Sequence, residues 1–172
     1  MRSARAQTET STRPSASGPQ CIGEVAPLRP LDEPPPYVAV DRLPVRRAVR
    51  PVRGPEDVYD ACTGLAKRRV EQFAVLLLNA RHEIQRRSTI STGSLNASIV
   101  HPREVFRPAI IGSAAAIILV HNHPSGDPEP SEEDLAITRR LAQVGELHGI
   151  NVLDHVIVAK GGFVSLRARG LI

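Results

Sequence analysis

The chain has 172 residues, of which 41% are hydrophobic, and a formal net charge of +4, which suits one globular domain. Its two cysteines, Cys21 and Cys62, lie in separate contexts and exclude both a disulfide framework and a cysteine metal site. No apolar run approaches the length of a membrane span, and the start lacks the apolar core of a secretory signal, so we expect a cytoplasmic protein that does not contact membranes.

The first third of the chain differs in composition from the rest. Ten of the 15 prolines lie in residues 1–55, together with many Ser, Thr, Gly and Arg residues. Such a segment has too little clustered apolar surface to offset the entropy lost on ordering, so we expect residues 1–36 to form a disordered tail. Residues 37–54 are predicted to be a linker or an edge segment, and residues 55–172 a single domain.

The positive charge belongs to the same N-terminal part. Residues 1–53 hold nine basic and five acidic residues, whereas residues 54–172 hold 13 of each. A basic segment attracts nucleic acid through nonspecific, salt-screened contacts, so the tail is a candidate nucleic-acid contact; the alternative is a solubilising linker. The whole chain has three Phe, two Tyr and no Trp, and its neutral domain lacks the basic, aromatic platform of a dedicated single-strand binder.

The domain is predicted to alternate strands with helices. Apolar residues at helical spacing predict a helix from Pro55, a second from Pro102 to about Ile111, and a third that ends near Gly149. The positions predicted to face the core are Val58, Ala61, Cys62 and Leu65 in the first, Val105, Ala109 and Ile110 in the second, and Ile137, Leu141, Val144 and Leu147 in the third. Strands are predicted at residues 73–78, 88–92, 95–100, 115–120, 151–159 and 163–166. This order predicts an α/β domain with a mixed sheet covered by helices.

Two histidines at the end of a predicted strand carry the clearest chemical signal. His121 and His123 follow an apolar run, and because residues i and i+2 of a strand project to the same face, both imidazoles can converge on one point. Asp134 follows after a turn-rich stretch, where the apolar pattern changes to helical spacing. Two neutral imidazoles and one carboxylate are a ligand set of catalytic zinc, which leaves a fourth position for water. The alternative is a pair of ordinary polar residues at a loop entrance.

The same segment contains a helix-start signal. Ser131 and Asp134 fit the pattern Ser-x-x-Asp, a near relative of the capping box, after Pro130 and before a helical pattern. Capping alone can account for the Ser131 hydroxyl, and it does not exclude a second, chemical role.

The spacing His-x-His-x7-Ser-x2-Asp, formed by His121, His123, Ser131 and Asp134, resembles the signature of the JAB/MPN-type (JAMM) metalloproteases. The surrounding sequence resembles the RadC branch of that family in three blocks: HNHPSG (121–126), VHPREV (100–105) and LDHVI (153–157). The resemblance covers about residues 55–172, and it implies the MPN fold.

The resemblance also implies roles for individual residues. In the family, a glutamate at the start of an upstream strand acts as the base on the water, and Glu71 matches that position; the alternative is a solvated strand terminus. The implied metal is one Zn²⁺ per chain, bound by His121, His123 and Asp134, although this ligand set alone also admits Fe²⁺ or Mn²⁺. Ser131 is then expected to donate a hydrogen bond to the developing oxyanion.

Other titratable residues near these blocks are predicted to be structural. His155 alternates within a predicted strand, so we expect a hydrogen-bonded core residue and not a ligand. Glu83, the nearest competitor of Glu71, lies in a predicted turn. His101 stands at a helix entrance, where it is structural or lines a pocket, and His148 at a helix C-terminus, where a cationic imidazole is favoured.

Together these features predict a zinc-dependent hydrolase, a metallopeptidase or isopeptidase that uses a metal-activated water on a peptide or protein substrate. The first alternative is a metal-dependent nuclease or a DNA-repair accessory protein of RadC type. The basic tail favours it, but the neutral domain does not, and residues 1–53 do not resemble the DNA-associated helix-hairpin-helix module of RadC-like proteins. The second alternative is a noncatalytic interaction module, as in MPN relatives without the ligands, and the presence of Glu71 and the ligand set argues against it.

Overall fold

The computed structural model describes residues 39–41, 51–93 and 100–172. Within these residues, six strands form one mixed sheet in the order β1-β3-β2-β4-β5-β6, and only the pair β4 and β5 is parallel. The strands are β1 (Ala39–Asp41), β2 (Gln72–Leu78), β3 (Ile84–Thr92), β4 (Ala116–Asn122), β5 (Asn151–Ala159) and β6 (Gly162–Ser165). The helices are α1 (Pro55–Ala61), α2 (Thr63–Ala66), α3 (Pro102–Ile111) and α4 (Glu132–His148). The prediction of an α/β domain with a mixed sheet is confirmed.

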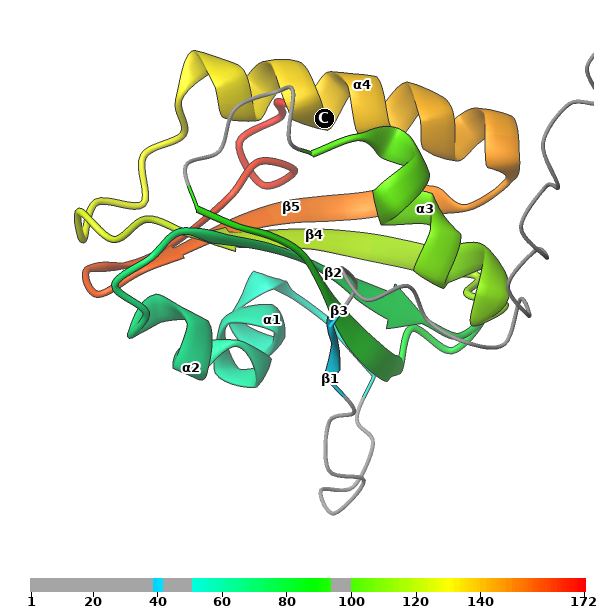
Figure 1. Ribbon diagram of the computed structural model, residues 1–172, viewed down its shortest axis with the longest axis horizontal. Helices are drawn as coiled ribbons and strands as arrows, with labels where there is room; N and C mark the ends of the chain where they lie inside the picture. The colour runs from blue at the N-terminus through cyan, green and yellow to red at the C-terminus, as the bar shows by residue number, and fades with distance from the viewer. Residues whose placement is uncertain (1–38, 42–50, 94–99) are drawn as a thin grey trace, which may run out of the picture. The chain divides into compact units, whose positions relative to one another are not determined.

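Helices cover both faces of the sheet. Figure 1 shows α3 and α4 on one face and α1 and α2 on the other. Alternate side chains of β2 enter the two cores: Phe73 and Val75 pack with residues of α3 and α4, and Leu76 and Leu78 pack with residues of α1 and α2. Because both faces are buried, β2 reads as a continuous apolar run without the alternation of a half-exposed strand.

Most predicted elements are present, with two differences in their bounds. The helix predicted from Pro55 is interrupted at Cys62, so that it forms α1 and the short α2. Gly64 in this region weakens a continuous helix. Strand β3 begins at Ile84 and is longer than predicted, because its N-terminal part pairs with β2 through Leu78. The strand predicted at 95–100 lies outside the described residues except for Val100, and the tail predicted at 1–36 lies wholly outside them. The edge segment predicted at 37–54 includes β1, which pairs with β3.

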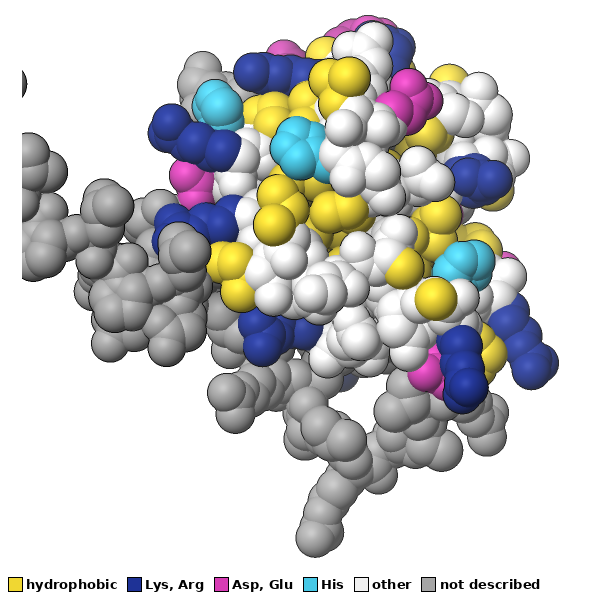
Figure 2. All heavy atoms as spheres, turned by 90° about the vertical axis from the view of Figure 1, so that its right-hand side faces the viewer, with side chains coloured by type: hydrophobic (Ala, Val, Ile, Leu, Met, Phe, Trp, Pro, Cys, Tyr) yellow, Lys and Arg dark blue, Asp and Glu magenta, His cyan; other side chains and the backbone are white. Residues whose placement is uncertain are grey.

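Two residues predicted to face the core are exposed instead. Ile110 is 53% exposed and Leu147 is 86% exposed. Leu147 follows Leu141 by six residues, and at 3.6 residues per turn this spacing turns it away from the buried face. Ile110 lies in the last turn of α3, at an apolar groove between α3 and α4. Figure 2 faces this end of the molecule and shows hydrophobic side chains among charged ones.

The pairing of the central strands brings distant residues to one end of the sheet. Phe73 at the start of β2 pairs with His121 near the end of β4, and His121 pairs with Ile157 of β5. The first turn of α4 lies near the same end, because α4 packs on β5. None of the helices in the described part of the chain combines the length and the apolar run that crossing a bilayer requires.

Candidate metal centre

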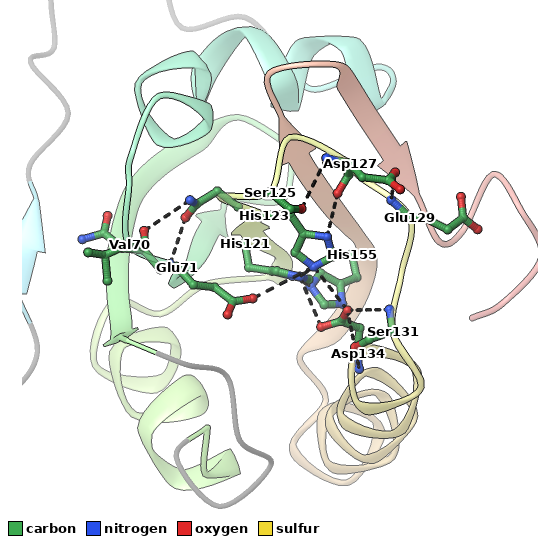
Figure 3. A network of polar contacts seen from close by, with 12 residues as sticks. Val70, Glu71, His121, His123, Ser125, Asp127, Glu129, Ser131, Asp134 and His155 are labelled. Carbon is green, nitrogen blue, oxygen red and sulfur yellow. Dashed lines mark hydrogen bonds and ion pairs between the residues drawn. The ribbon is translucent and has the colours of Figure 1, made fainter.

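Two imidazole nitrogens and a carboxylate meet at the end of β4. Nε2 of His121 lies 2.9 Å from Nε2 of His123 and 3.2 Å from Oδ1 of Asp134, and Nε2 of His123 lies 3.5 Å from Oδ2 of Asp134 (Figure 3). The structure therefore brings together the three residues that the sequence proposes as ligands. His121 and Asp134 are buried, while His123 is partly exposed.

This arrangement fits a tetrahedral zinc ion. Ligand atoms about 2.0–2.2 Å from a tetrahedral ion are about 3.3 Å apart. The two histidine nitrogens lie 2.9 Å apart, and each lies near that value from one carboxylate oxygen of Asp134: His121 is 3.2 Å from Oδ1 and His123 is 3.5 Å from Oδ2. Nitrogen donors combined with one oxygen donor are also the chemistry of a catalytic site with an open position.

A second carboxylate approaches the histidines. Glu71 directly precedes β2, and its Oε1 lies 4.0 Å from Nε2 of His123. One ligand atom each from Glu71, His121 and His123 lies within 4.8 Å of the others, so geometry alone also admits Glu71 as a ligand. The closer carboxylate is that of Asp134, which favours Asp134 in the coordination shell and Glu71 beyond it. Glu83 lies at the other end of β2, where its carboxylate accepts a hydrogen bond from Asn79.

Ser131 forms the helix cap that its sequence pattern predicts. Its Oγ accepts a hydrogen bond from the backbone nitrogen of Asp134, and the backbone nitrogen of Ser131 donates to Oδ2 of Asp134, which together make a capping box. The Ser131 hydroxyl also donates to Oδ2 of Asp134, at 2.7 Å. The cap thus holds the proposed ligand, and the expected donation from Ser131 to an oxyanion stays a prediction.

The loop after β4 orients His123. Nδ1 of His123 donates to the backbone oxygen of Asp127 at 2.9 Å. Gly126 precedes Asp127 with a φ of 97°, a left-handed conformation that glycine adopts without strain and that turns the chain back. Because a carbonyl oxygen can only accept, the proton of a neutral His123 ring is on Nδ1, and the lone pair of Nε2 faces the centre.

The charges of the centre depend on one another. Burial acts to raise the pKa of the Asp134 carboxyl, but the adjacent imidazole rings of His121 and His123 and the hydrogen bond from Ser131 outweigh it and hold that pKa well below its usual range. The hydrogen bond with Asp134 raises the pKa of His123, against the effect of burial. Burial lowers the pKa of His155 well below its ordinary value. Asp134 is therefore ionised at neutral pH.

The structure adds two polar residues that the sequence analysis did not single out. Asn122, between the two histidines on β4, points to the opposite face and accepts a hydrogen bond from the backbone nitrogen of Gln72 at 2.8 Å. Thr138, one turn after Asp134 on α4, is buried and contacts His155. The signal available for Thr138 was a polar residue between the apolar core positions Ile137 and Leu141. His155 is a buried, hydrogen-bonded core residue, as predicted.

Comparisons with known proteins match the same part of the chain. A family model described as the RadC-like JAB domain matches residues 52–171. A UPF0758 protein of Geobacter sulfurreducens is 56% identical over 119 residues, which are 69% of this chain and 52% of the relative. UPF0758 proteins of Desulforamulus reducens and Methanosarcina mazei are 52% and 45% identical, over 70% and 74% of this chain and 54% and 56% of the relatives. The chain thus spans about half the length of these curated relatives.

Proposed function

The chain belongs to the family of RadC-like JAB domains, and on that premise we propose that it is a zinc-dependent hydrolase of peptide or isopeptide bonds. The observation that carries the proposal is the meeting of His121, His123 and Asp134 at separations suited to one ion, with the carboxylate of Glu71 next to them. A merely structural zinc site is closed by four protein ligands, whereas these three leave a position free for chemistry.

Each residue has a defined task in this reaction. Zinc, when bound, supplies a Lewis acid and lowers the pKa of water from about 15.7 to about 7. Glu71 accepts a proton on Oε1 as the water oxygen attacks the carbonyl carbon, and returns it to the amine nitrogen as the carbon–nitrogen bond breaks. Asp134 and the two histidines hold the metal. The Ser131 hydroxyl is proposed to turn from Asp134 to the oxyanion that develops during the attack.

The substrate class is a peptide or protein with an accessible amide bond. A partly exposed Glu71 and His123 face the outside of the domain, so an extended backbone can reach them, whereas the ligands His121 and Asp134 stay buried. The domain carries no net charge, so a polyanionic nucleic-acid substrate gains no general attraction from it.

The test is a comparison of two glutamates at opposite ends of β2. We expect Glu71→Gln to lower the rate of hydrolysis by about 10²–10⁴-fold while zinc content is kept, because an amide is not a base at neutral pH. Glu83→Gln is the matched control, since Glu83 bonds to Asn79 and lies away from the centre. The assay screens unfolded peptides and isopeptide-linked substrates, with single- and double-stranded DNA in parallel.

The outcomes separate the alternatives. Full activity of the Glu71 variant would show that Glu71 is not the base, and loss of zinc would make it a ligand. Cleavage of DNA and of no peptide by the wild type would favour the nuclease. Absence of zinc binding by the wild type would contradict the proposal as a whole.

A further inference from the structure

A line of buried polar atoms runs from His121 into α4, behind the metal centre. Nδ1 of His121 lies 2.8 Å from Nε2 of His155, and Nδ1 of His155 lies 2.5 Å from Oγ1 of Thr138. The same Oγ1 lies 2.5 Å from the backbone oxygen of Asp134. The side chains of His121, His155 and Thr138 have no solvent exposure, so water does not substitute for any of these contacts.

The chemistry of the groups sets the direction of each hydrogen bond. A carbonyl oxygen can only accept, so the Thr138 hydroxyl donates its single proton to Asp134. The hydroxyl must then accept from His155, which places the His155 proton on Nδ1. A neutral His155 therefore has its lone pair on Nε2, and it accepts from Nδ1 of His121. His121 is left with the lone pair of its own Nε2 facing the metal centre.

We propose that Thr138 and His155 are positioning residues that fix the tautomer of His121, so that Nε2 of His121 is available to the metal. This inference rests on the proposed function in so far as the metal is zinc. The two proposed histidine ligands differ in what fixes their tautomers. His123 bonds to the carbonyl oxygen of Asp127, which can only accept, whereas an imidazole partner can either donate or accept. His121 therefore needs a third group, Thr138, to decide between the two tautomers.

The surrounding structure keeps the line in place. The ring of Phe73 stacks on His121, with centroids 6.0 Å apart, and meets His155 edge-on at 5.5 Å, which opposes rotation of either imidazole. Thr138 is one turn from Asp134, so α4 supplies both a metal ligand and the hydroxyl that orients another ligand. Partners of this kind, behind the direct ligands, typically change metal affinity about 10–100-fold when they are removed.

The test uses the full chain with ¹⁵N-labelled histidine rings. In the metal-free wild type, long-range ¹H–¹⁵N spectra should show the proton of His155 on Nδ1, and a proton on Nδ1 of His121. In Thr138→Val, the His155 proton should move to Nε2, because Nδ1 would otherwise face a methyl group. Nε2 of His155 then donates to His121, and we expect zinc affinity to fall about 10–100-fold.

Thr138→Ser is the matched variant. Serine keeps the hydroxyl but deletes a buried methyl group, so it should retain the wild-type tautomers and zinc affinity although it lowers the stability of the fold. Valine keeps the volume and loses the hydroxyl. If Thr138 only packed the core, serine would be the more harmful change for zinc affinity as well as for stability.

Three results would overturn the inference. The first is a wild-type His155 that is protonated on Nε2 alone. The others are a folded Thr138→Val variant with wild-type tautomers, and a folded Thr138→Val variant with wild-type zinc affinity. A wild type that binds no zinc would instead contradict the proposed function. The ring protons of the metal-free protein would still decide whether Thr138 and His155 set the tautomer of His121.

Discussion

The side-chain oxygen of Asn122 accepts a hydrogen bond of 2.8 Å from the backbone nitrogen of Gln72. The side-chain nitrogen of the same Asn122 donates to the backbone oxygens of Arg68 and Val70, at 3.4 and 3.3 Å. One buried carboxamide thus holds the chain on both sides of Glu71. The residue that separates the two histidines in sequence therefore fixes the position of the proposed base.

Asn122→Ala is expected to slow hydrolysis and to keep zinc bound. A misplacement of about 1 Å at a reacting group can cost about 10²-fold in rate, and the side chain of Asn122 points away from the ligands. Peptide cleavage and zinc content should be measured together. Gln72→Ala is the control, because it leaves the backbone nitrogen that bonds to Asn122. Equal losses in both variants, or none in Asn122→Ala, would contradict this role.

Asp134→Asn is expected to remove zinc without removing the helix cap. The amide oxygen can still accept from the backbone of Ser131, but a neutral amide is a much weaker zinc ligand than a carboxylate. Zinc content after dialysis is the measurement. Ser131→Ala should do the reverse: it should cost about 1 kcal/mol of stability through the lost cap and keep zinc. A variant of Asp134 with undiminished zinc would exclude Asp134 as a ligand.

Zinc affinity is expected to fall as the pH is lowered. The hydrogen bond with Asp134 raises the pKa of His123 above 6.5, so protons compete for Nε2 at a higher pH than they would for an ordinary histidine. Affinity should be full above this raised pKa and decrease below it. Titrations with a competing chelator between about pH 6 and pH 8 would measure the change. His148→Ala should show the same pH dependence as the wild type. A zinc affinity that does not change over that pH range would refute the assignment.

In the metal-free protein, the pair of His123 and Asp134 should stabilise the fold more at mildly acidic pH than at higher pH, which is opposite to the pH dependence of zinc affinity. A raised folded-state pKa means that the contribution of His123 is fully present below its unfolded value near 6.5 and is lost as pH rises through the folded value. The lowered pKa of Asp134 keeps its contribution in place above its unfolded value near 3.8. Urea denaturation of wild type and His123→Gln without metal should therefore differ most in mildly acidic solution.

The charge of the sequence predicts nucleic-acid contact by the basic N-terminal part as a whole, but residues 1–36 carry no net charge. The prediction is therefore narrowed: any nucleic-acid binding should depend on residues 42–53 and not on residues 1–36. Residues 42–53 hold five arginines and no acidic residue, whereas residues 1–36 hold four basic and four acidic residues. Replacing Arg46 and Arg47 by Gln should weaken DNA binding. The slope of log affinity against log salt concentration should become less steep by about 0.9 for each phosphate that is no longer neutralised. Deletion of residues 1–36 should leave the affinity unchanged; an equal decrease on deletion would contradict this.

The convergence of the two histidines was predictable from strand periodicity alone. His121 and His123 lie two residues apart, and their Nε2 atoms are 2.9 Å apart in the structure. The cap at Ser131 was predictable for a similar reason, since the capping box is a local pattern of four residues. Local periodicity also explains the errors, because Ile110 and Leu147 continue an apolar pattern beyond the part of each helix that is covered.

The roles of Asn122 and Thr138 were not predictable in the same way. Asn122 bonds to residues 50 to 54 positions away, and Thr138 to a histidine 17 positions away. No local spacing encodes such contacts, because they depend on which strands are neighbours in the sheet. The sequence marks Asn122 and Thr138 only as polar residues at positions where an apolar residue is expected.

The centre is assembled from strands that are neighbours in space but not along the chain. Glu71 precedes β2, His121 lies near the end of β4, and His155 lies in β5, so the site cannot form before these three strands pair. The three proposed ligands lie close together in sequence, at residues 121–134, but their placement depends on the packing of α4 on β5, so a partly folded chain would not hold them in position. Metal uptake is therefore expected to be all-or-none with the folding of the domain, and a bound ion would act as a reporter of complete central-sheet formation.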